Sequence, residues 1–192
     1  MPLKNTTPLH KAIRLTTLTA IFSLSSTVNT IYAQENSTFR VGMTAAEIPL
    51  TTGNPDQGFE GFRFMGLMLY DALILWDLSS SDEPSQLMPG LATEWSVDPD
   101  DQTSWTFKLR EGVVFHDGSE FNADSVIWNF DKLKDPDSPQ YDPRQAGLAS
   151  ERIPSIVAVN KVDDYTVEIV TDSPTAYLPF QTSYWMMSSP AQ

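Results

Sequence analysis

The sequence from residue 91 to residue 126 reads LATEWSVDPDDQTSWTFKLREGVVFHDGSEFNADSV, and it decides the expected fold. Residues 93–97 and 104–110 have strand character, and the turn residues DPDDQ at 98–102 join them. Three apolar side chains alternate with polar ones along the second strand: Trp105, Phe107 and Leu109. This period of two is typical of a strand with one buried face. We therefore expect a hairpin that buries these three side chains.

A short strand and a capped helix are expected directly after the hairpin. Gly112 permits a tight turn, residues 113–115 suit a short strand, and the sequence HDG at 116–118 suits the next turn. Asn122 is a good N-cap for a helix over residues 123–134. Four apolar residues form its expected buried face: Val126, Ile127, Phe130 and Leu133.

Patterns on either side of this stretch extend the prediction. Apolar residues recur at steps of three and four over residues 62–76, which predicts a helix with one broad buried face. Three prolines make residues 135–143 irregular. A second hairpin pairs residues 156–160 with 166–171, and a short helix follows over residues 175–181. A first strand is expected over residues 38–43, with a long polar loop after it.

Residues 1–33 have the layout of a secretory signal peptide. They contain three Lys or Arg residues and no acidic residue, and residues 15–32 form an apolar run rich in Ser and Thr. That polar content disfavours the alternative of an uncleaved membrane anchor. We expect cleavage after Ala33, which leaves residues 34–192 as a single domain.

Charge and cysteine content narrow the classes of function. The formal net charge is −13, and it becomes −16 when the three positive charges of residues 1–33 are removed. Such a chain repels phosphate backbones and anionic lipid, so we expect no nucleic-acid partner. The chain has no Cys, and therefore no disulfide, thiolate metal ligand or acceptor for a lipid anchor.

Catalytic and metal-binding patterns are not supported by the residues. His116 is the sole histidine of residues 34–192, which leaves little for a His metal site or a Ser-His-Asp triad. The acidic residues at 98–101 lack the spacing of a calcium loop, and Asp163 and Asp164 are adjacent in a turn. No Gly-rich phosphate loop follows a strand. We expect a protein that is not an enzyme and has no cofactor.

The stretch from residue 91 to residue 126 resembles the signature region of the extracytoplasmic solute-binding proteins, family 5, of peptide and nickel ABC importers. The resemblance continues upstream in GLMLYDALILWD and downstream in VDDYTVEIVTDSPTAYLPF. The residues that carry it within the signature are Trp105, Phe107, Leu109, Arg110, Gly112, Val113, Phe115, Asp117, Gly118, Ala123, Asp124 and Val126. Most of these residues have scaffold roles in turns and in the core.

The resemblance implies both a fold and a function. The fold is mixed α/β (α+β): a periplasmic-binding-protein-like first lobe, incomplete at residue 192, with a mixed sheet, hairpins and packed helices, and with the second lobe absent. The function is capture of peptides or similar small solutes in the periplasm, as a monomer, for the permease subunits of an ABC importer.

Ligand-binding residues are also implied by the resemblance. The loop Thr44, Ala45, Ala46 and Glu47 and the pair Tyr184 and Trp185 would border the ligand cleft. The alternative for Tyr184 and Trp185 is a place in the core. A second reading of the whole chain is a stand-alone secreted protein-interaction module derived from such a lobe.

Overall fold

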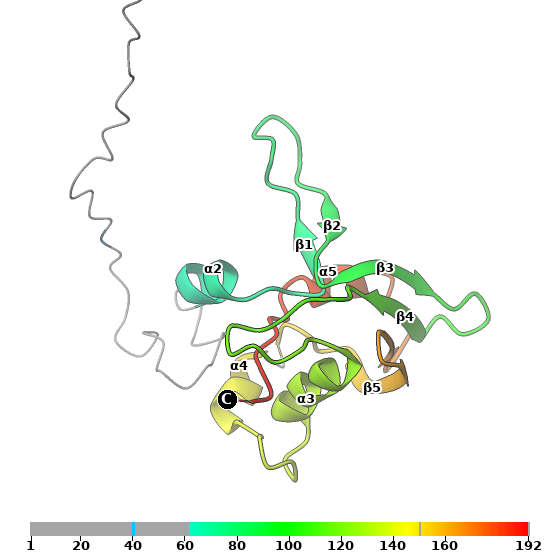
Figure 1. The fold of residues 1–192 in the computed structure, drawn as a ribbon. Helices are drawn as coiled ribbons and strands as arrows, with labels where there is room; N and C mark the ends of the chain where they lie inside the picture. The colour runs from blue at the N-terminus through cyan, green and yellow to red at the C-terminus, as the bar shows by residue number, and fades with distance from the viewer. Residues whose placement is uncertain (1–39, 41–61, 150, 192) are drawn as a thin grey trace, which may run out of the picture. The chain divides into compact units, whose positions relative to one another are not determined.

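A computed structural model describes residues 40, 62–149 and 151–191, and every element below lies in the unit formed by residues 41–192. The expected signal peptide at 1–33, the expected strand at 38–43 and the loop residues 44–47 lie outside the described residues, apart from Arg40. Helices and strands are both present, which confirms the mixed α/β class (Figure 1).

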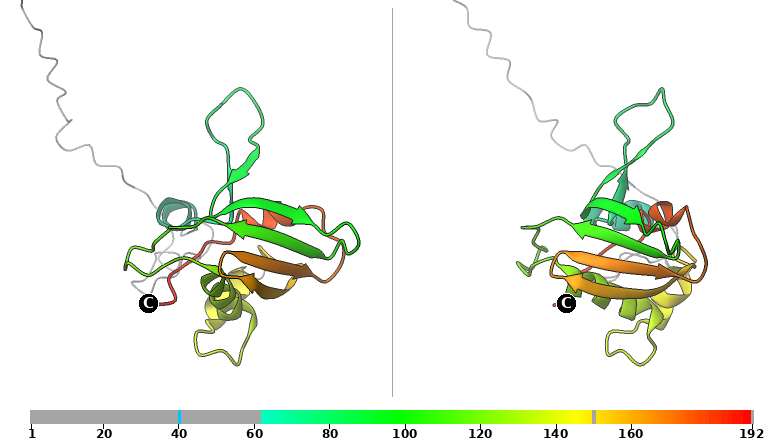
Figure 2. Two further views of the ribbon diagram at one scale, coloured as in Figure 1. Left: turned by 45° about the vertical axis from the view of Figure 1, so that its right-hand side comes forward. Right: turned by 90° about the vertical axis from the view of Figure 1, so that its right-hand side faces the viewer.

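Two hairpins build a four-stranded sheet. Strands β3 (Ala92–Val97) and β4 (Ser104–Leu109) form the first, and β5 (Ile156–Asp163) and β6 (Thr166–Thr171) form the second. The strand order is β3-β4-β6-β5 and every pair is antiparallel, so β4 and β6 join the hairpins. Figure 2 shows the two hairpins side by side, with the helix α3 beneath the second. Both predicted hairpins are confirmed.

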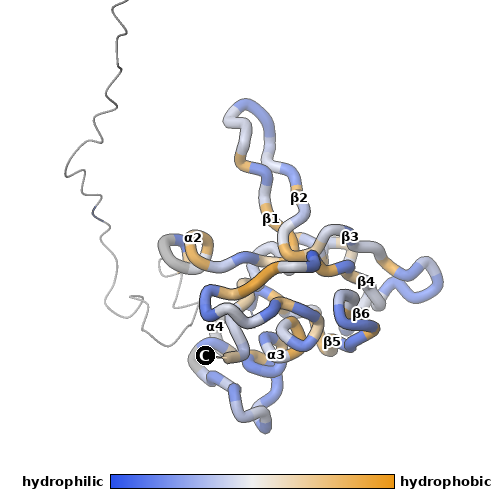
Figure 3. Tube along the Cα trace, in the orientation of Figure 1, coloured by the Kyte–Doolittle hydropathy of each residue, from blue (hydrophilic) through white to orange (hydrophobic). Residues whose placement is uncertain are grey.

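The core lies on one face of this sheet. Phe107 is completely buried, and Trp105 and Leu109 on the same face of β4 are nearly so. Across the strand pair, Trp105 stands opposite Ile169 and Phe107 opposite Val167, which are buried too. The predicted inward face of the aromatic strand is confirmed. The turn between β3 and β4 is hydrophilic (Figure 3).

Helix α3 (Ala123–Lys134) has the predicted bounds and the predicted cap. The Oδ1 atom of Asn122 accepts a hydrogen bond from the Ser125 backbone N–H at 3.2 Å, and the Asn122 backbone N–H donates to Ser125 Oγ at 3.4 Å. This reciprocal pair is a capping box in which Ser takes the usual place of Glu. The helix packs on β5 and β6 through Val126 and Leu133.

The predicted helix over residues 62–76 is wrong in its second half. A π-helical turn (Phe62–Gly66) and α2 (Leu67–Leu69) are helical, but Ile74–Trp76 is strand β1, paired with β2 (Leu87–Pro89). Non-local hydrogen bonds explain the change, because the carbonyl of Leu73 accepts from Gly90 and Ala92. Leu73 and Ile74 are both fully buried, whereas a helix with one apolar face would expose part of this run.

The short strand predicted after the first hairpin also needs correction. Residues 113–115 do not form a strand, since Val114 makes only a single bridge to Glu120 and is 64% exposed. The turns on either side are as predicted, with Gly112 and Gly118 at φ of 73° and 85°.

Prolines delimit two helices near the end of the chain. Residues 135–142 are irregular as predicted, but α4 (Pro143–Ala149) was not expected. Proline is tolerated in a first helical turn, which explains how Pro143 can begin a helix. Helix α5 (Leu178–Thr182) begins three residues later than predicted and packs on β1.

Candidate functional site

An apolar cavity of about 560 Å³ lies beside the β1–β2 hairpin. We call it the aromatic pocket. Its apolar wall is formed by Leu67, Leu75, Trp76, Leu78, Tyr184 and Met186, and its polar groups come from Tyr70, Asp71, Ser85 and Ser183. Apolar walls with a few polar groups are typical of small-molecule sites. Figure 3 shows that the base of the hairpin is hydrophobic while its far end is mostly hydrophilic.

Three ring contacts fix the aromatic wall of this pocket. The Trp76 ring lies 5.6 Å from the Phe180 ring and 6.4 Å from the Tyr184 ring, measured between centroids. Tyr184 also contacts Phe62 at 6.0 Å. The rings are tilted or edge-on, which is a favourable arrangement. Trp76 of β1 and Tyr184 after α5 therefore line the pocket together, and Phe180 of α5 packs behind them against Trp76.

The structure separates the two aromatic residues that were predicted to bind ligand together. Tyr184 is 40% exposed and lines the aromatic pocket, whereas Trp185 is 3% exposed and packs edge-on against Phe130 of α3. Tyr184 closes the turn after α5 through a hydrogen bond from its N–H to the Gln181 carbonyl, whereas Trp185 is the first residue beyond that turn. Tyr184 remains a candidate for ligand contact, and Trp185 is part of the core.

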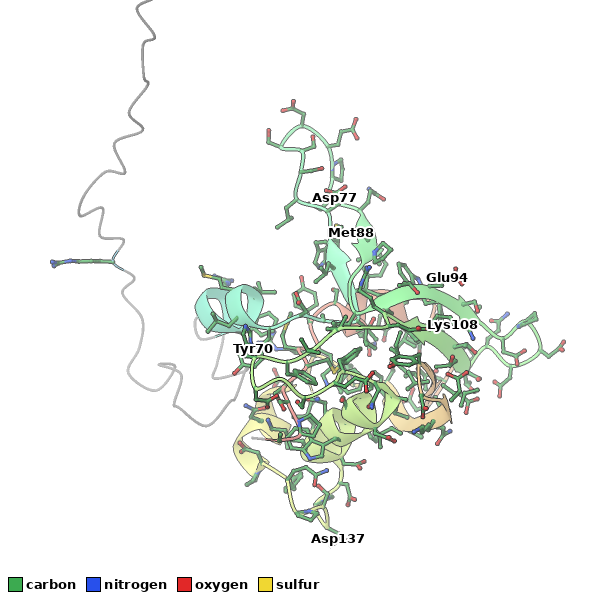
Figure 4. The ribbon with its side chains drawn as sticks, in the orientation of Figure 1. Tyr70, Asp77, Met88, Glu94, Lys108 and Asp137 are labelled. Carbon is green, nitrogen blue, oxygen red and sulfur yellow. The ribbon has the colours of Figure 1, made fainter. Side chains whose placement is uncertain are left out.

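A second, smaller cavity of about 80 Å³ adjoins the aromatic pocket. Tyr70 and Asp71 line both cavities, and His116, Ser188 and Ser189 contribute polar atoms to the smaller one. Partial burial raises the pKa of the Tyr70 hydroxyl above its ordinary value, so this group is a neutral hydrogen-bond donor at physiological pH. Figure 4 shows Tyr70 beside α2.

The segment that carries Met186 and Ser188 is held against α3 by Asn129. The Asn129 Oδ1 atom accepts from the backbone N–H and the hydroxyl of Ser188, each at 3.0 Å, and its Nδ2 atom donates to the Ser188 carbonyl at 2.8 Å. On the other side, the Met187 N–H donates to the Asp71 carbonyl at 2.9 Å. We call this arrangement around Asn129 and Ser188 the amide clamp. It holds in place a segment whose residue Met186 lines the aromatic pocket and whose residue Ser188 lines the smaller cavity.

Lys132 adds a buried cation to the amide clamp. Its Nζ atom donates to Ser188 Oγ at 3.1 Å and lies 5.1 Å from the centre of the Trp128 ring. Only 7% of the residue is exposed, and this burial lowers the pKa of the ammonium to about 8, although the charge of Asp142 acts in the opposite direction. This contact was not predicted, because an isolated Lys on a helix is normally exposed.

The described residues offer binding groups and lack a metal cluster. No group of three or more His, Asp or Glu side chains is placed to hold a metal ion in residues 62–149 and 151–191. Over the same residues, no helix has the length and apolar character required to cross a membrane.

Sequence reasoning missed three residues that line the aromatic pocket: Trp76, Tyr70 and Asp71. The signal available for Trp76 was a pair of short apolar runs separated by the turn residues 79–84.

The comparisons with known proteins identify the class of protein to which this fold and pocket belong. Residues 86–191 match the family model of the bacterial extracellular solute-binding proteins, family 5 Middle. The chain belongs to that family. The prediction made from residues 91–126 is thereby confirmed.

Among its relatives, the chain is 35% identical over 120 residues to the dipeptide-binding protein of Escherichia coli (strain K12), which is 56% of this chain and 21% of that protein. It is 31% identical over 163 residues to the di/tripeptide-binding protein 4 of Pseudomonas aeruginosa (strain UCBPP-PA14), which is 73% of this chain and 30% of that one. The chain therefore spans between about a fifth and a third of the length of these relatives.

Solved structures show the same fold. A dipeptide-binding protein from Pseudoalteromonas sp. SM9913, in complex with Met-Leu, superposes with a TM-score of 0.58 at 25% identity. The match covers 76% of this chain and 29% of that protein. NikA from Brucella suis, in complex with Fe(III)-EDTA, gives a TM-score of 0.53 at 29% identity. That match covers 66% of this chain and 23% of NikA. Both are periplasmic-binding-protein folds, as expected for the first lobe.

Proposed function

We propose that this chain is a ligand-binding part of a non-catalytic, periplasmic component of an ABC importer for peptides or similar small solutes. Membership in solute-binding family 5 is the observation that carries the proposal. The aromatic pocket supports it, because it offers an apolar wall with a few polar groups. Residues 1–33 would direct the chain to the periplasm and be removed, and permease subunits would be its partners in the membrane.

Ligand would act by stabilising one conformation of the complete binding protein, which the permease then recognises. Thr44, Ala45, Ala46 and Glu47 would contact this ligand together with Tyr184. Trp185 would contribute only through the core, since its ring packs against Phe130. The chain is expected to act as a monomer, and its excess of acidic residues disfavours a nucleic-acid partner.

Peptide binding is expected to raise the thermal midpoint of the chain purified from the periplasm. A ligand present at ten times its Kd stabilises the folded state by about 1.4 kcal/mol, or about 3–6 °C for a chain of this size. Differential scanning fluorimetry with a series of di- and tripeptides measures the shift, and mass spectrometry of the same sample measures cleavage after Ala33. A sugar mixture is the control. An unchanged midpoint with every peptide would contradict peptide capture.

A second function, as a protein-interaction module, is favoured by the apolar side chains around α2. Leu67, Met68 and Leu69 are about half exposed or more, and Leu78 on the hairpin is 78% exposed. Contiguous exposed apolar surface often marks a protein-binding site. Self-association measured by light scattering, and lost in a Met68→Glu variant, would favour this function over solute capture.

A further inference from the structure

A third cavity, of about 400 Å³, lies beside the first turns of α3. We call it the α3 groove. Two parts of the chain line it, namely residues 119–128 and residues 190–191. The lining residues that matter for recognition are Ser119, Glu120, Asn122, Asp124, Trp128 and Pro190. None of them lines the aromatic pocket or the smaller cavity, so the α3 groove is a separate candidate site.

Hydrogen bonds hold the two parts of the α3 groove together. The hydroxyl groups of Ser119 and Ser189 share a hydrogen bond at 3.0 Å, although these residues are 70 positions apart in the chain. The Ser119 hydroxyl also donates to Asp117 at 2.6 Å, and the Ala191 N–H donates to Ser189 Oγ at 3.0 Å. These contacts fix the position of Pro190 relative to α3. The groove is therefore preformed, as small-molecule sites usually are.

Two flat apolar side chains line the α3 groove, the indole of Trp128 and the ring of Pro190. Both residues are partly buried. The Lys132 ammonium lies 5.1 Å from the centre of the Trp128 ring and helps to hold the indole in place. A planar ring gains the most contact when it stacks on an indole. The apolar part of the groove therefore suits a flat aromatic ligand.

The polar groups of the α3 groove are rich in hydrogen-bond acceptors. Glu120 Oε1 accepts from the Tyr165 hydroxyl, and Asp124 Oδ2 accepts from Lys161 at 2.9 Å. The second oxygen of each carboxylate has no partner in residues 62–149 or 151–191. Over the same residues, the Asn122 Nδ2 atom also has no partner and can donate to a carbonyl. A matching ligand therefore carries N–H donors on its edge beside a carbonyl group.

We propose that the α3 groove binds a neutral planar heterocycle with N–H donors on its edge, stacked on Trp128, with Glu120 and Asp124 accepting from those donors. A guanine base has this chemistry, because it presents adjacent N–H groups and a carbonyl. The site goes beyond solute capture in the aromatic pocket. The two carboxylates and the net charge of −13 repel a phosphate group, so the ligand is a free base or a nucleoside and not a nucleotide.

Calorimetric titration with guanosine, inosine and guanosine monophosphate tests this assignment. The natural chain is expected to bind guanosine about fivefold more tightly than inosine, which lacks the exocyclic amino group and its N–H donors. Guanosine monophosphate should also bind about fivefold more weakly than guanosine, because its phosphate is repelled. A Trp128→Leu variant should bind guanosine about tenfold more weakly than the natural chain, since the stacking surface is lost.

Two further variants make the role of Trp128 specific. Trp128→Phe keeps a flat ring and should retain most of the affinity for guanosine, which separates stacking from an effect on folding. Tyr177→Leu is the matched control, because Tyr177 is an exposed aromatic residue that lines none of the three cavities described here. This variant should bind guanosine as the natural chain does.

A competition experiment separates the α3 groove from the aromatic pocket. Guanosine should bind equally well with and without an excess of the peptide Phe-Gly-Gly, since the two sites share no lining residue. Competition would assign guanosine to the aromatic pocket and overturn the inference, and so would absence of guanosine binding or tighter binding of the monophosphate. Each of these results would leave solute capture standing. Guanosine binding that depends on Trp128, in a chain that binds no peptide, would support the groove and count against the proposed function.

Discussion

An Asn129→Ala variant is expected to lose about 3–5 kcal/mol of unfolding free energy. The side chain satisfies the N–H, the carbonyl and the hydroxyl of Ser188, and both residues are almost completely buried. Alanine leaves two backbone groups without a partner in the core, and each unsatisfied buried group costs about 1–3 kcal/mol. The Nδ2 bond to the Ser125 carbonyl at 2.9 Å is lost as well. Urea unfolding followed by tryptophan fluorescence measures the loss.

Asn160→Ala is the matched control for this experiment. Asn160 is exposed on β5, and its amide donates to the Glu168 carboxylate at 2.9 Å. Surface substitutions of this kind change stability by about 0.5 kcal/mol or less. The amide clamp would be unimportant to the fold if both variants unfolded at the same urea concentration.

The hairpins and helix α3 could be predicted because their signals are local. Alternation at Trp105, Phe107 and Leu109 has a period of two, and Asn122 stands directly before the apolar face of α3. In both elements the residues that determine the structure lie within a few positions of each other. Tertiary packing reinforces these preferences instead of opposing them.

Strand β1 could not be predicted in the same way, because its structure depends on distant residues. The apolar positions of residues 62–76 fit a helical period, yet the Ala72 and Leu73 carbonyls accept from residues 90–92. Pairing with β2 overrides the local preference, and it brings Trp76 to the wall of the aromatic pocket. Among the described residues, the candidate site was consequently predicted at Tyr184 and Trp185, and only Tyr184 lines the pocket.

The amide clamp shows a second limit of sequence reasoning. Asn129 and Lys132 occupy helix positions that would ordinarily be exposed, and their partner Ser188 is more than fifty residues away in the chain. No period or motif in a single sequence joins such residues. Burial of a polar side chain becomes evident only when the structure supplies its partner.

A Lys132→Met variant is expected to increase stability at pH 7 by about 1–3 kcal/mol and to remove a pH dependence. Burial lowers the pKa of Lys132 from 10.5 to about 8 in the folded state. Below pH 8 Lys132 is protonated in both the folded and the unfolded chain. The folded state then carries the full free-energy cost of burying the ammonium group. Between pH 8 and pH 10.5 the unfolded chain binds more protons than the folded one, so the stability of the natural chain rises with pH, by about 3 kcal/mol in total.

Unfolding in urea at pH 7, 8.5 and 10 measures this difference between the natural chain and the variant. The gain from methionine should shrink as pH rises, because the natural lysine then loses its charge. Lys161→Met is the contrasting control. Ion pairs with Asp124 and Asp164, both at 2.9 Å, raise the pKa of Lys161, so its stabilising contribution is present below pH 10.5 and decreases above it. A stability difference for Lys132→Met that stays constant from pH 7 to pH 10 would show that the pKa of Lys132 in the folded chain is close to its value in the unfolded chain, and would contradict the burial penalty.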